Sequence, residues 1–251
     1  MTFTETIDSH GLALAAYLAR PPQGGAGAAL VLCHGFPAGP GGAATSAQTY
    51  PVLADRLAAD TGWTVLVFTF RGAGGSEGNF SLAGWRDDIV AAVDKLSADP
   101  VVRGVWLAGS STGGALAVCA AAADARVRGV ATLAAPAAFD DWASDGQRFL
   151  ATCRDIGVVR DADYPPSLEA WVRELRELRP LDVVGDLTDR SLLIMHGADD
   201  DIVPLADARA LADASQGAAE LRVINGAGHR LRHDPRAIAL LTGWMERQTI
   251  E

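Results

Sequence analysis

Short apolar runs alternate with longer amphipathic segments along most of this chain. The runs are rich in Val, Leu and Ala, as in strands buried on both faces, and the segments between them carry apolar residues at helical spacing. This alternation predicts an α/β fold with a mostly parallel central sheet of about eight strands and helices on both faces. The predicted strands are residues 4–9, 12–20, 28–34, 64–70, 102–109, 129–134, 191–196 and 219–224, and the predicted helices are residues 50–60, 85–98, 112–123, 206–214 and 235–248.

Two segments depart from this alternation. A tight Ser-His-Gly turn at residues 9–11 joins the first two strands, so we expect them to pair antiparallel at one edge of the sheet. The second departure is residues 139–187, which carry two tryptophans, a Pro-Pro step and a helical pattern at residues 167–179. We expect this segment to form a small helical cap inserted into a single domain that spans residues 1–251.

Four aromatic residues of the expected cap are candidates for a substrate pocket, namely Trp142, Phe149, Tyr164 and Trp171. Ligand pockets are lined mainly by apolar and aromatic side chains, which favours this role. The same side chains are equally suited to anchor a cap on the sheet. The sequence does not decide between the two roles.

Composition and charge narrow the classes of partner. Hydrophobic residues make up 49% of the chain and charged residues 21%, which is typical of a folded globular protein. The formal net charge of -10 and the lack of a dense Lys/Arg run argue against nucleic acid as a partner. We expect no membrane association and a cytoplasmic location, because the first residues lack a secretory pattern and no apolar run reaches spanning length. Oligomeric state is left open.

The cysteines do not form a metal-binding pattern. Cys33, Cys119 and Cys153 are far apart and lack both CxxC spacing and a neighbouring His/Cys cluster. We expect them to be reduced and structural, and we expect no metal site.

The run Gly-Ser-Ser-Thr-Gly at residues 109–113 carries the first candidate for chemistry. Ser111 alone among its hydroxyl groups has glycine two positions before and two positions after it. In a Gly-x-Ser-x-Gly turn between a strand and a helix, the central serine protrudes and the next backbone N–H faces the attacked carbonyl. An apolar run precedes this turn and a helical segment follows it, so Ser111 is predicted to be a nucleophile. Ser110 is expected to stabilise the turn.

A serine nucleophile needs a base, and the base needs an acid. Of the five histidines, His229 lies in a glycine loop directly after the last predicted strand, where the base is expected. His233 is less favoured because it falls at the start of the last helix, and His196 is interpreted as a packed residue that supports the acid loop. The acid is expected within the Asp-Asp-Asp run at residues 199–201, and the residues alone do not say which carboxylate it is.

With these loops in chain order, the sequence resembles the α/β-hydrolase superfamily over nearly its whole length, and especially its small-cap esterases and its dienelactone-hydrolase-like or peptidase-like members. Residues 34–37 resemble the family's HG-x-P loop, which implies that the Phe36 and Thr112 N–H groups form an oxyanion hole. Residues 196–204 resemble the HG-x-x-D-x-x-V-P stretch, which implies that Asp200 is the acid. Residues 71–76 resemble the RG-x-G-x-S loop and are interpreted as a tight structural turn rather than a phosphate cradle.

The expected function is cleavage of a carboxylic ester of a small or medium acyl substrate through an acyl-enzyme on Ser111, without a cofactor. Thioesterase and peptidase or amidase activities are the alternatives, because the same triad serves them. A non-catalytic ligand receptor on the same fold is less favoured. Arg230 and Arg232 beside the base are expected either to bind an anionic acyl group or, preferably, to pair with surface carboxylates.

Overall fold

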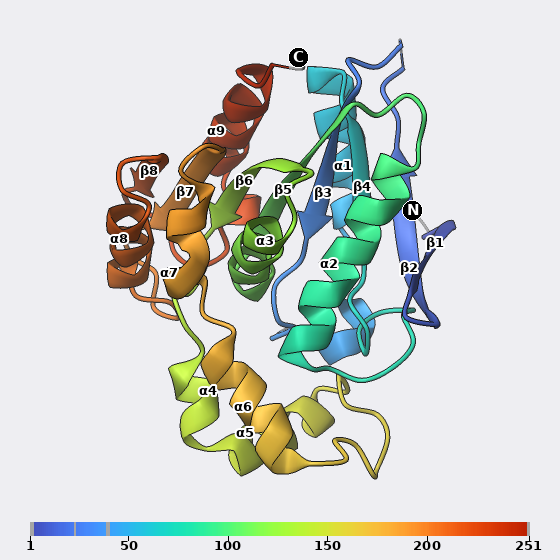
Figure 1. Ribbon diagram of the computed structural model, residues 1–251, viewed down its shortest axis with the longest axis vertical. Coiled ribbons are helices and arrows are strands. Elements are labelled where there is room, and N and C mark those ends of the chain that lie inside the picture. Colours follow the sequence, from blue (N-terminus) through green and yellow to red (C-terminus); the bar gives the residue numbers. More distant parts are fainter. Residues whose placement is uncertain (1–2, 23, 39–40, 250–251) are drawn as a thin grey trace.

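The computed structural model describes residues 3–22, 24–38 and 41–249 (Figure 1). In this part of the chain, eight strands form one sheet in the spatial order β1-β2-β4-β3-β5-β6-β7-β8. The strands are β1 (Glu5–Ser9), β2 (Leu12–Ala19), β3 (Ala28–Cys33), β4 (Thr64–Phe68), β5 (Gly104–Ser110), β6 (Val127–Leu133), β7 (Ser191–Gly197) and β8 (Ala219–Ile224).

The sheet has an antiparallel edge and a parallel body. β1 pairs antiparallel with β2, and β2 pairs antiparallel with β4. The remaining neighbours pair parallel from β4 across to β8. His10 and Gly11 both have positive φ, which lets the chain reverse between β1 and β2 in two residues. The predicted fold class and the antiparallel edge are both confirmed.

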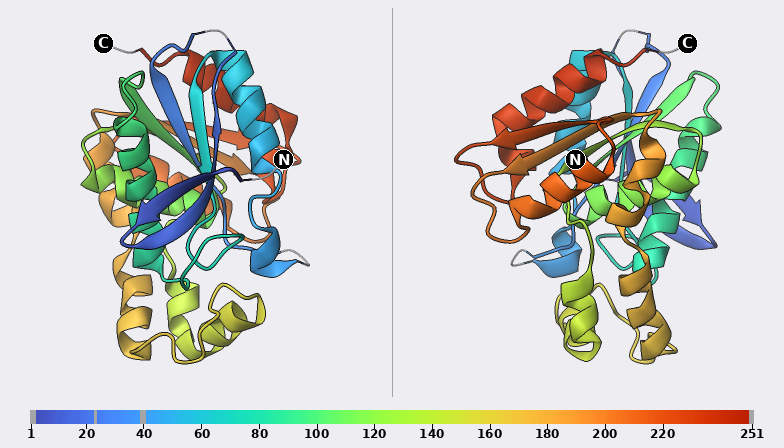
Figure 2. Two further views of the ribbon diagram at one scale, coloured as in Figure 1. Left: turned by 90° about the vertical axis from the view of Figure 1, so that its right-hand side faces the viewer. Right: turned by 60° about the vertical axis from the view of Figure 1, so that its left-hand side comes forward.

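Helices cover both faces of the sheet (Figure 2). α1 (Tyr50–Thr61) and α9 (Pro235–Glu246) contact each other and pack on one face. α2 (Leu82–Ser97), α3 (Thr112–Ala123) and α8 (Leu205–Ala214) pack on the other. No helix within the described ranges is both long and apolar enough to cross a bilayer.

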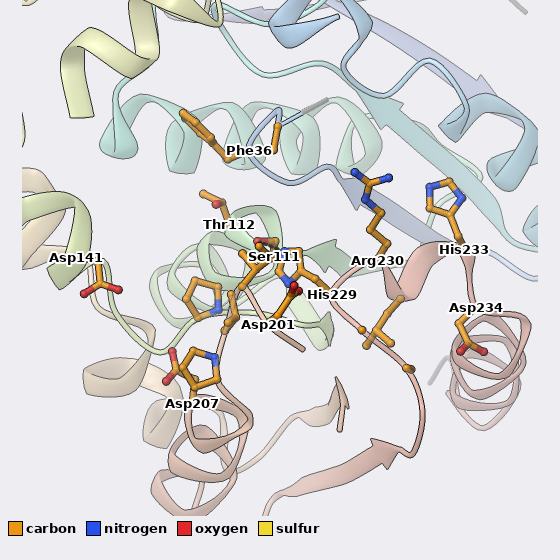
Figure 3. Close-up of a pocket in the computed structure, with 18 of the residues that line it drawn as sticks. Phe36, Ser111, Thr112, Asp141, Asp201, Asp207, His229, Arg230, His233 and Asp234 are labelled. Carbon is orange, nitrogen blue, oxygen red and sulfur yellow. Dashed lines mark hydrogen bonds between the residues drawn. The ribbon is translucent and has the colours of Figure 1, made fainter. Parts of the chain in front are cut away.

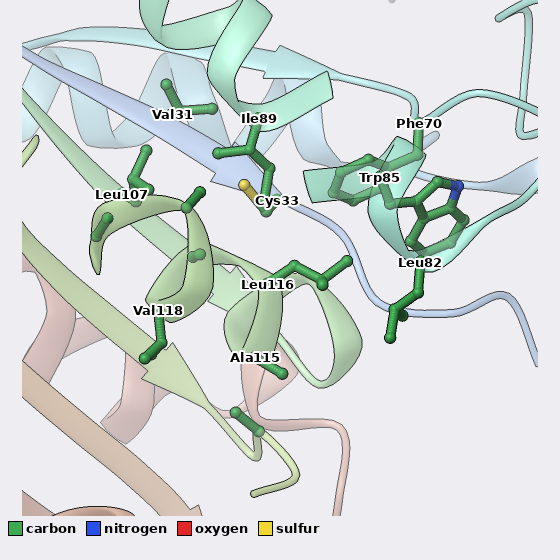
Figure 4. Packing of buried hydrophobic residues seen from close by; sticks show 14 of the residues in the cluster. Val31, Cys33, Phe70, Leu82, Trp85, Ile89, Leu107, Ala115, Leu116 and Val118 are labelled. Atoms are coloured by element: carbon green, nitrogen blue, oxygen red, sulfur yellow. The ribbon is translucent and has the colours of Figure 1, made fainter. Parts of the chain in front are cut away.

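The core beneath α2 and α3 fixes the end of the sheet where the candidate nucleophile lies (Figure 4). Ile89 and Trp85 of α2 and Leu116 of α3 are fully buried over the end of β3. Trp85 stacks on Phe70, with ring centroids 4.4 Å apart and an interplanar angle of 9°. A fully buried aliphatic side chain contributes about 1.5–3 kcal/mol of burial free energy, so this packing stabilises the strand ends.

Several element boundaries differ from the predicted ones, and the caps explain two of them. The helix predicted from residue 85 begins at Leu82, because Ser81 Oγ accepts a hydrogen bond from the Gly84 N–H. The helix predicted at residues 167–179 covers Leu168–Glu177 (α6), and Ser167 Oγ accepts from the Ala170 N–H. The strand predicted from residue 102 begins at Gly104. Apolar periodicity alone does not mark these ends.

Between β6 and β7 the chain forms a separate helical segment. It contains α4 (Asp140–Ser144), α5 (Gly146–Asp155), α6, α7 (Pro180–Val183) and the 3-10 turn η2 (Val184–Leu187). The first three of these helices lie together beyond the end of the sheet at which β3 finishes (Figure 1). Phe36, just after β3, contacts the rings of Trp142 and Phe149 from this segment. The segment therefore lies against the loops that carry the candidate site.

A buried ion pair anchors the loop after β4. Asp88 is fully buried, and its carboxylate accepts hydrogen bonds from the Arg71 backbone N–H, the Arg71 guanidinium and the Ser9 hydroxyl. These bonds tie the loop at residues 71–76 to α2 and to the end of β1. The structural interpretation of this loop agrees with these contacts.

We expect Asp88→Asn to lower the free energy of unfolding by about 3 kcal/mol, because it leaves the Arg71 guanidinium without its buried counter-charge. Urea unfolding monitored by circular dichroism measures the change. Asp87→Asn is the matched control, since Asp87 pairs with Arg86 at the surface and its loss is expected to cost less than about 1 kcal/mol. Equal effects of the two substitutions would contradict the anchoring role.

Candidate active site

Ser111 lies at a strained turn between β5 and α3. Its φ of 51° and ψ of −124° fall outside the regions that most residues adopt. A Cβ at Gly113 would lie 2.2 Å from the His34 carbonyl oxygen, and one at Gly109 would lie 2.5 Å from the Gly113 carbonyl carbon. Both glycines are thus required by close backbone approach. This is the geometry that the Gly-x-Ser-x-Gly spacing predicts.

A hydrogen-bonded series connects Ser111, His229 and Asp200. His229 Nε2 lies 3.1 Å from Ser111 Oγ, and His229 Nδ1 lies 2.9 Å from Asp200 Oδ2 and 3.2 Å from Oδ1. Because a carboxylate only accepts hydrogen bonds, Nδ1 carries the proton and Nε2 is left to accept the serine hydroxyl. The Asp200 side chain is fully buried, whereas the His229 side chain is 19% exposed.

The loop after β7 selects Asp200 from its two neighbours. Asp200 Oδ1 accepts hydrogen bonds from the Ile202 and Val203 backbone N–H groups, each at 2.9 Å. These bonds hold the carboxylate in an inward orientation. Asp199 and Asp201 are exposed. The structure therefore brings to His229 the carboxylate that the motif comparison indicated.

The other two histidines that follow Ser111 in the chain occupy supporting and peripheral positions. His196 is fully buried, and its Nε2 lies 2.9 Å from the Val203 carbonyl oxygen and 3.3 Å from Asp200 Oδ2. It thus packs behind the acid loop, as its sequence position suggested. His233 is exposed in the 3-10 turn η3 (Leu231–His233), beside the site but away from Ser111 Oγ.

His34 orients the loop after β3, a role that the sequence did not reveal. The Phe70 backbone N–H donates to His34 Nε2 at 3.1 Å, so the ring proton is on Nδ1, which donates to the Gly35 carbonyl at 2.7 Å. Burial lowers the pKa of His34 to about 4, which keeps the ring neutral at pH 7. In the trans peptide that follows, the Phe36 N–H points opposite to the Gly35 carbonyl, away from His34. The sequence feature that could have indicated this role is the histidine of the HG motif.

The second predicted oxyanion donor is at the start of α3. Thr112 is the first residue of that helix and is buried, so its N–H has no acceptor within the helix. The loop that carries Phe36 packs directly on the elbow, since a Cβ at Gly35 would lie 3.2 Å from Ser111 Cβ. The amides of Phe36 and Thr112 thus flank Ser111 from two different elements.

A cavity of about 1030 Å³ opens over Ser111 and His229 (Figure 3). Its apolar lining includes Phe36, Phe139 and Trp142. Phe139 was not singled out by the sequence, because an isolated aromatic residue at a loop end carries no periodic signal. The cavity is large enough for a drug-sized molecule.

Of the four cap aromatics proposed from the sequence, Trp142 lines this cavity, and the other three are placed elsewhere in the described structure. Phe149 is buried behind it, stacked between Trp142 and Trp171 with ring centroids 4.3 Å and 5.5 Å apart. Trp171 also donates from its indole N–H to the Phe80 carbonyl. Tyr164 is half-buried beyond the cavity lining. Of the two roles that the sequence left open, anchoring of the helical segment fits the contacts of Phe149 and Trp171, and Tyr164 does not line the cavity either.

The cysteines do not line the cavities at this site. The three cysteines are buried and unpaired, and burial raises the pKa of Cys119 and Cys153 to about 12, so their thiolate forms are scarce at neutral pH. Among the residues that the structure describes, no group of three or more His, Cys, Asp or Glu side chains is arranged to hold a metal ion.

Comparison with known proteins agrees with this architecture. A model of the alpha/beta hydrolase family matches residues 30–240. No curated protein sequence matches the chain. Among solved structures, the chain is similar to Est1E from Butyrivibrio proteoclasticus with ferulic acid bound, at 23% identity over 97% of this chain and 96% of that one, with a TM-score of 0.74.

Two further solved structures are similar to it. The alpha/beta hydrolase GrgF from Penicillium sp. sh18 is 19% identical over 97% of both chains, with a TM-score of 0.72. Proline iminopeptidase from Mycobacterium smegmatis is 17% identical, again over 97% of both chains, with a TM-score of 0.68. At such identities these structures show the shared fold alone, whereas the family model covers most of the sequence. The chain belongs to the alpha/beta hydrolase family.

Proposed function

We propose that this protein is a serine hydrolase that cleaves a carboxylic ester of a small or medium acyl substrate through an acyl-enzyme on Ser111. The observation that carries the proposal is the position of His229, with Nε2 3.1 Å from Ser111 Oγ and Nδ1 2.9 Å from the buried Asp200 carboxylate. A serine becomes a competent nucleophile when a base so oriented takes its proton. A non-catalytic receptor does not need this alignment.

The proposed reaction has two acyl-transfer steps. His229 Nε2 takes the Ser111 proton as Oγ attacks the ester carbonyl carbon, and the oxyanion is stabilised by the Phe36 and Thr112 amides. The imidazolium then protonates the departing alcohol as the C–O bond breaks. Water, deprotonated by the same nitrogen, attacks the acyl-enzyme carbonyl carbon. The imidazolium then returns this proton to Ser111 Oγ as the bond between Oγ and the acyl carbon breaks, which releases the acid. Asp200 keeps the Nδ1 proton in place throughout and stabilises the imidazolium.

Esters are placed ahead of thioesters and amides as substrates. The cavity offers an aromatic wall of Phe139 and Trp142 beside Ser111, and α4–α6 act in this proposal as a cap over the substrate. Est1E, the similar structure with ferulic acid bound, holds an aromatic carboxylic acid, the kind of product that ester hydrolysis releases. The similar proline iminopeptidase keeps amide cleavage as the second candidate.

Labelling with a fluorophosphonate probe tests this proposal in the unmodified protein. We expect one label per chain, located on Ser111 by peptide mass spectrometry, and a burst of p-nitrophenol on mixing with p-nitrophenyl butyrate. Butyrylthiocholine and butyryl p-nitroanilide, in parallel assays, rank thioester and amide cleavage against ester cleavage. Heat-unfolded protein is the control for non-specific labelling. A label on Ser110, or no label and no burst, would contradict the proposal.

A further inference from the structure

A second, smaller cavity adjoins Ser111 and shares part of its lining with the larger one. Its volume is about 290 Å³, and both cavities include Phe36, Ser111, His229 and Arg230 in their walls. The smaller cavity extends beneath the loop after β3, between η3 and the start of α1. A substrate whose scissile carbonyl lies at Ser111 can therefore reach into both spaces. The two spaces can hold different parts of one molecule.

The two cavities differ sharply in charge. The described residues that line the smaller cavity include Arg230, Arg232 and three histidines, and none of them is an aspartate or glutamate. The larger cavity is lined by several carboxylates, namely Asp141, Asp201, Asp207 and Asp234. Figure 3 shows Asp141 and Asp207 on the opposite side of Ser111 from Arg230. A cavity free of acidic lining is notable in a chain with a net charge of -10.

Arg230 has no protein partner within the described ranges. It is exposed, and its side chain makes no ion pair and no hydrogen bond there, although the chain carries an excess of carboxylates. Three other arginines share this condition, namely Arg103, Arg148 and Arg209, and none of them lines either cavity. The surface pairing favoured from the sequence is therefore not found for Arg230. Its charge remains free for a ligand beside the nucleophile.

Arg232 is held in place without being neutralised. Its Nη1 donates to Thr49 Oγ1 at 2.7 Å, and its guanidinium carbon lies 5.0 Å from the centre of the Tyr50 ring. Neither partner carries a negative charge at neutral pH. Partial burial and the two arginines lower the pKa of His233, as expected where positive potential is concentrated. The guanidinium is thus held in position, and no described carboxylate neutralises it.

Ser46 supplies an independent sign that this cavity takes a polar group. The residue lines the cavity, and its Oγ is buried and has no hydrogen-bond partner among the described residues. An unsatisfied buried hydroxyl is costly, so such a group is expected to meet a partner in the loaded site. The Ser46 hydroxyl and the two guanidinium groups can all donate hydrogen bonds, and none of them is negatively charged. That set complements a carboxylate.

We propose that the smaller cavity is a subsite for a carboxylate carried by the substrate, bound by Arg230 and Arg232 and by the Ser46 hydroxyl. The proposal rests on the proposed hydrolase function and narrows its substrate class to esters with a free carboxylate. The aromatic cavity then holds the apolar part of the same molecule. The carboxylate can belong to the acyl group, as in a monoester of a dicarboxylic acid, or to the leaving alcohol, and the experiment separates the two.

The test compares matched anionic and neutral esters by kcat/KM, with spontaneous hydrolysis subtracted. p-Nitrophenyl hydrogen glutarate against p-nitrophenyl valerate tests the acyl side, and 3-acetoxybenzoate against phenyl acetate tests the leaving side. In one pair, we expect kcat/KM for the anionic ester to exceed kcat/KM for the neutral ester about tenfold or more. Arg230→Gln is expected to lower this ratio of the two kcat/KM values about tenfold, and Arg230→Lys is expected to keep most of it. Arg209→Gln is the matched control and leaves the ratio unchanged.

Two further variants and one binding measurement make the outcomes distinguishable. Ser46→Ala and Arg232→Lys are expected to lower the ratio less than Arg230→Gln does, about threefold each. If neutral esters turn over and Ser111 is labelled but neither pair shows an anionic preference, the subsite is wrong and the hydrolase function stands. If no ester turns over, titration calorimetry with glutarate decides. Glutarate binding to the unmodified protein that is lost in Arg230→Gln would support the subsite and reject the hydrolase function. No glutarate binding to the unmodified protein would reject both proposals.

Discussion

Ser111→Ala is expected to lower kcat for an activated ester by about 10⁵- to 10⁶-fold, because it removes the only oxygen that lies within hydrogen-bond reach of His229 Nε2 in the described structure. The residual rate is expected to remain about 10³-fold or more above that of water, since the backbone amides of the oxyanion site and the cavity are unchanged. Stopped-flow and long-time-course assays with p-nitrophenyl butyrate measure both rates, and the loss of the burst reports the missing acyl-enzyme.

The neighbouring hydroxyl provides the matched control. Ser110 ends β5, one residue before the elbow, and makes no hydrogen bond to His229. Ser110→Ala is therefore expected to keep activity within about tenfold of the unmodified protein, a loss no larger than a modest change in turn geometry produces. Thermal unfolding of both variants checks that the fold is retained. A folded Ser111→Ala protein that still produces a burst would show that another residue is the nucleophile.

Features that depend on local backbone geometry could be predicted from the sequence. The glycines at positions 109 and 113 each lie two positions from Ser111, and the same short spacing produces the close contacts seen at the elbow. The strands and helices were predicted because parallel strands buried on both faces leave an apolar signature that does not depend on distant residues. The placement of the candidate loops at one end of the sheet followed from that topology.

Features that depend on long-range packing were beyond the sequence. Phe149 and Trp171 are 22 positions apart in the chain, and only the folded segment shows that they stack on each other rather than line the cavity. The same holds for His34, whose tautomer is set by the Phe70 amide in the loop after β4. That Arg230 meets no carboxylate among the described residues is equally a property of the fold. No pattern within a single segment encodes such contacts.

The choice among the three adjacent aspartates could be predicted from the sequence only in part. Repulsion predicted that only one carboxylate would face the histidine, and the motif comparison indicated Asp200. The physical reason is local, since the turn after it directs two backbone N–H groups at Asp200 Oδ1. Those bonds depend on the backbone conformation of the loop, which apolar periodicity does not specify.

Asp200→Asn is expected to lower kcat by about 10⁴-fold through a change of tautomer at His229. The Ile202 and Val203 N–H groups require an acceptor at the Oδ1 position, so the asparagine oxygen takes that place and its NH₂ group faces His229 Nδ1. Nδ1 must then accept a hydrogen bond, which moves the ring proton to Nε2. A protonated Nε2 cannot take the Ser111 proton, although the side chains keep nearly the same positions.

Asp199→Asn is the control for this substitution, because it removes the same charge from an exposed side chain one residue away. It is expected to change kcat by less than about threefold, as surface charges contribute little. Single-turnover kinetics with p-nitrophenyl butyrate separate slowed acylation from weakened binding, and Asp200→Asn is expected to slow acylation with little change in KM. Comparable losses in the two variants would mean that net charge near the site matters and that the Asp200 carboxylate does not set the tautomer.

A double variant tests whether Asp200 and His229 act as one unit. Because both residues act on the same proton, the variant that combines Asp200→Asn with His229→Ala should have a kcat little lower than that of His229→Ala alone.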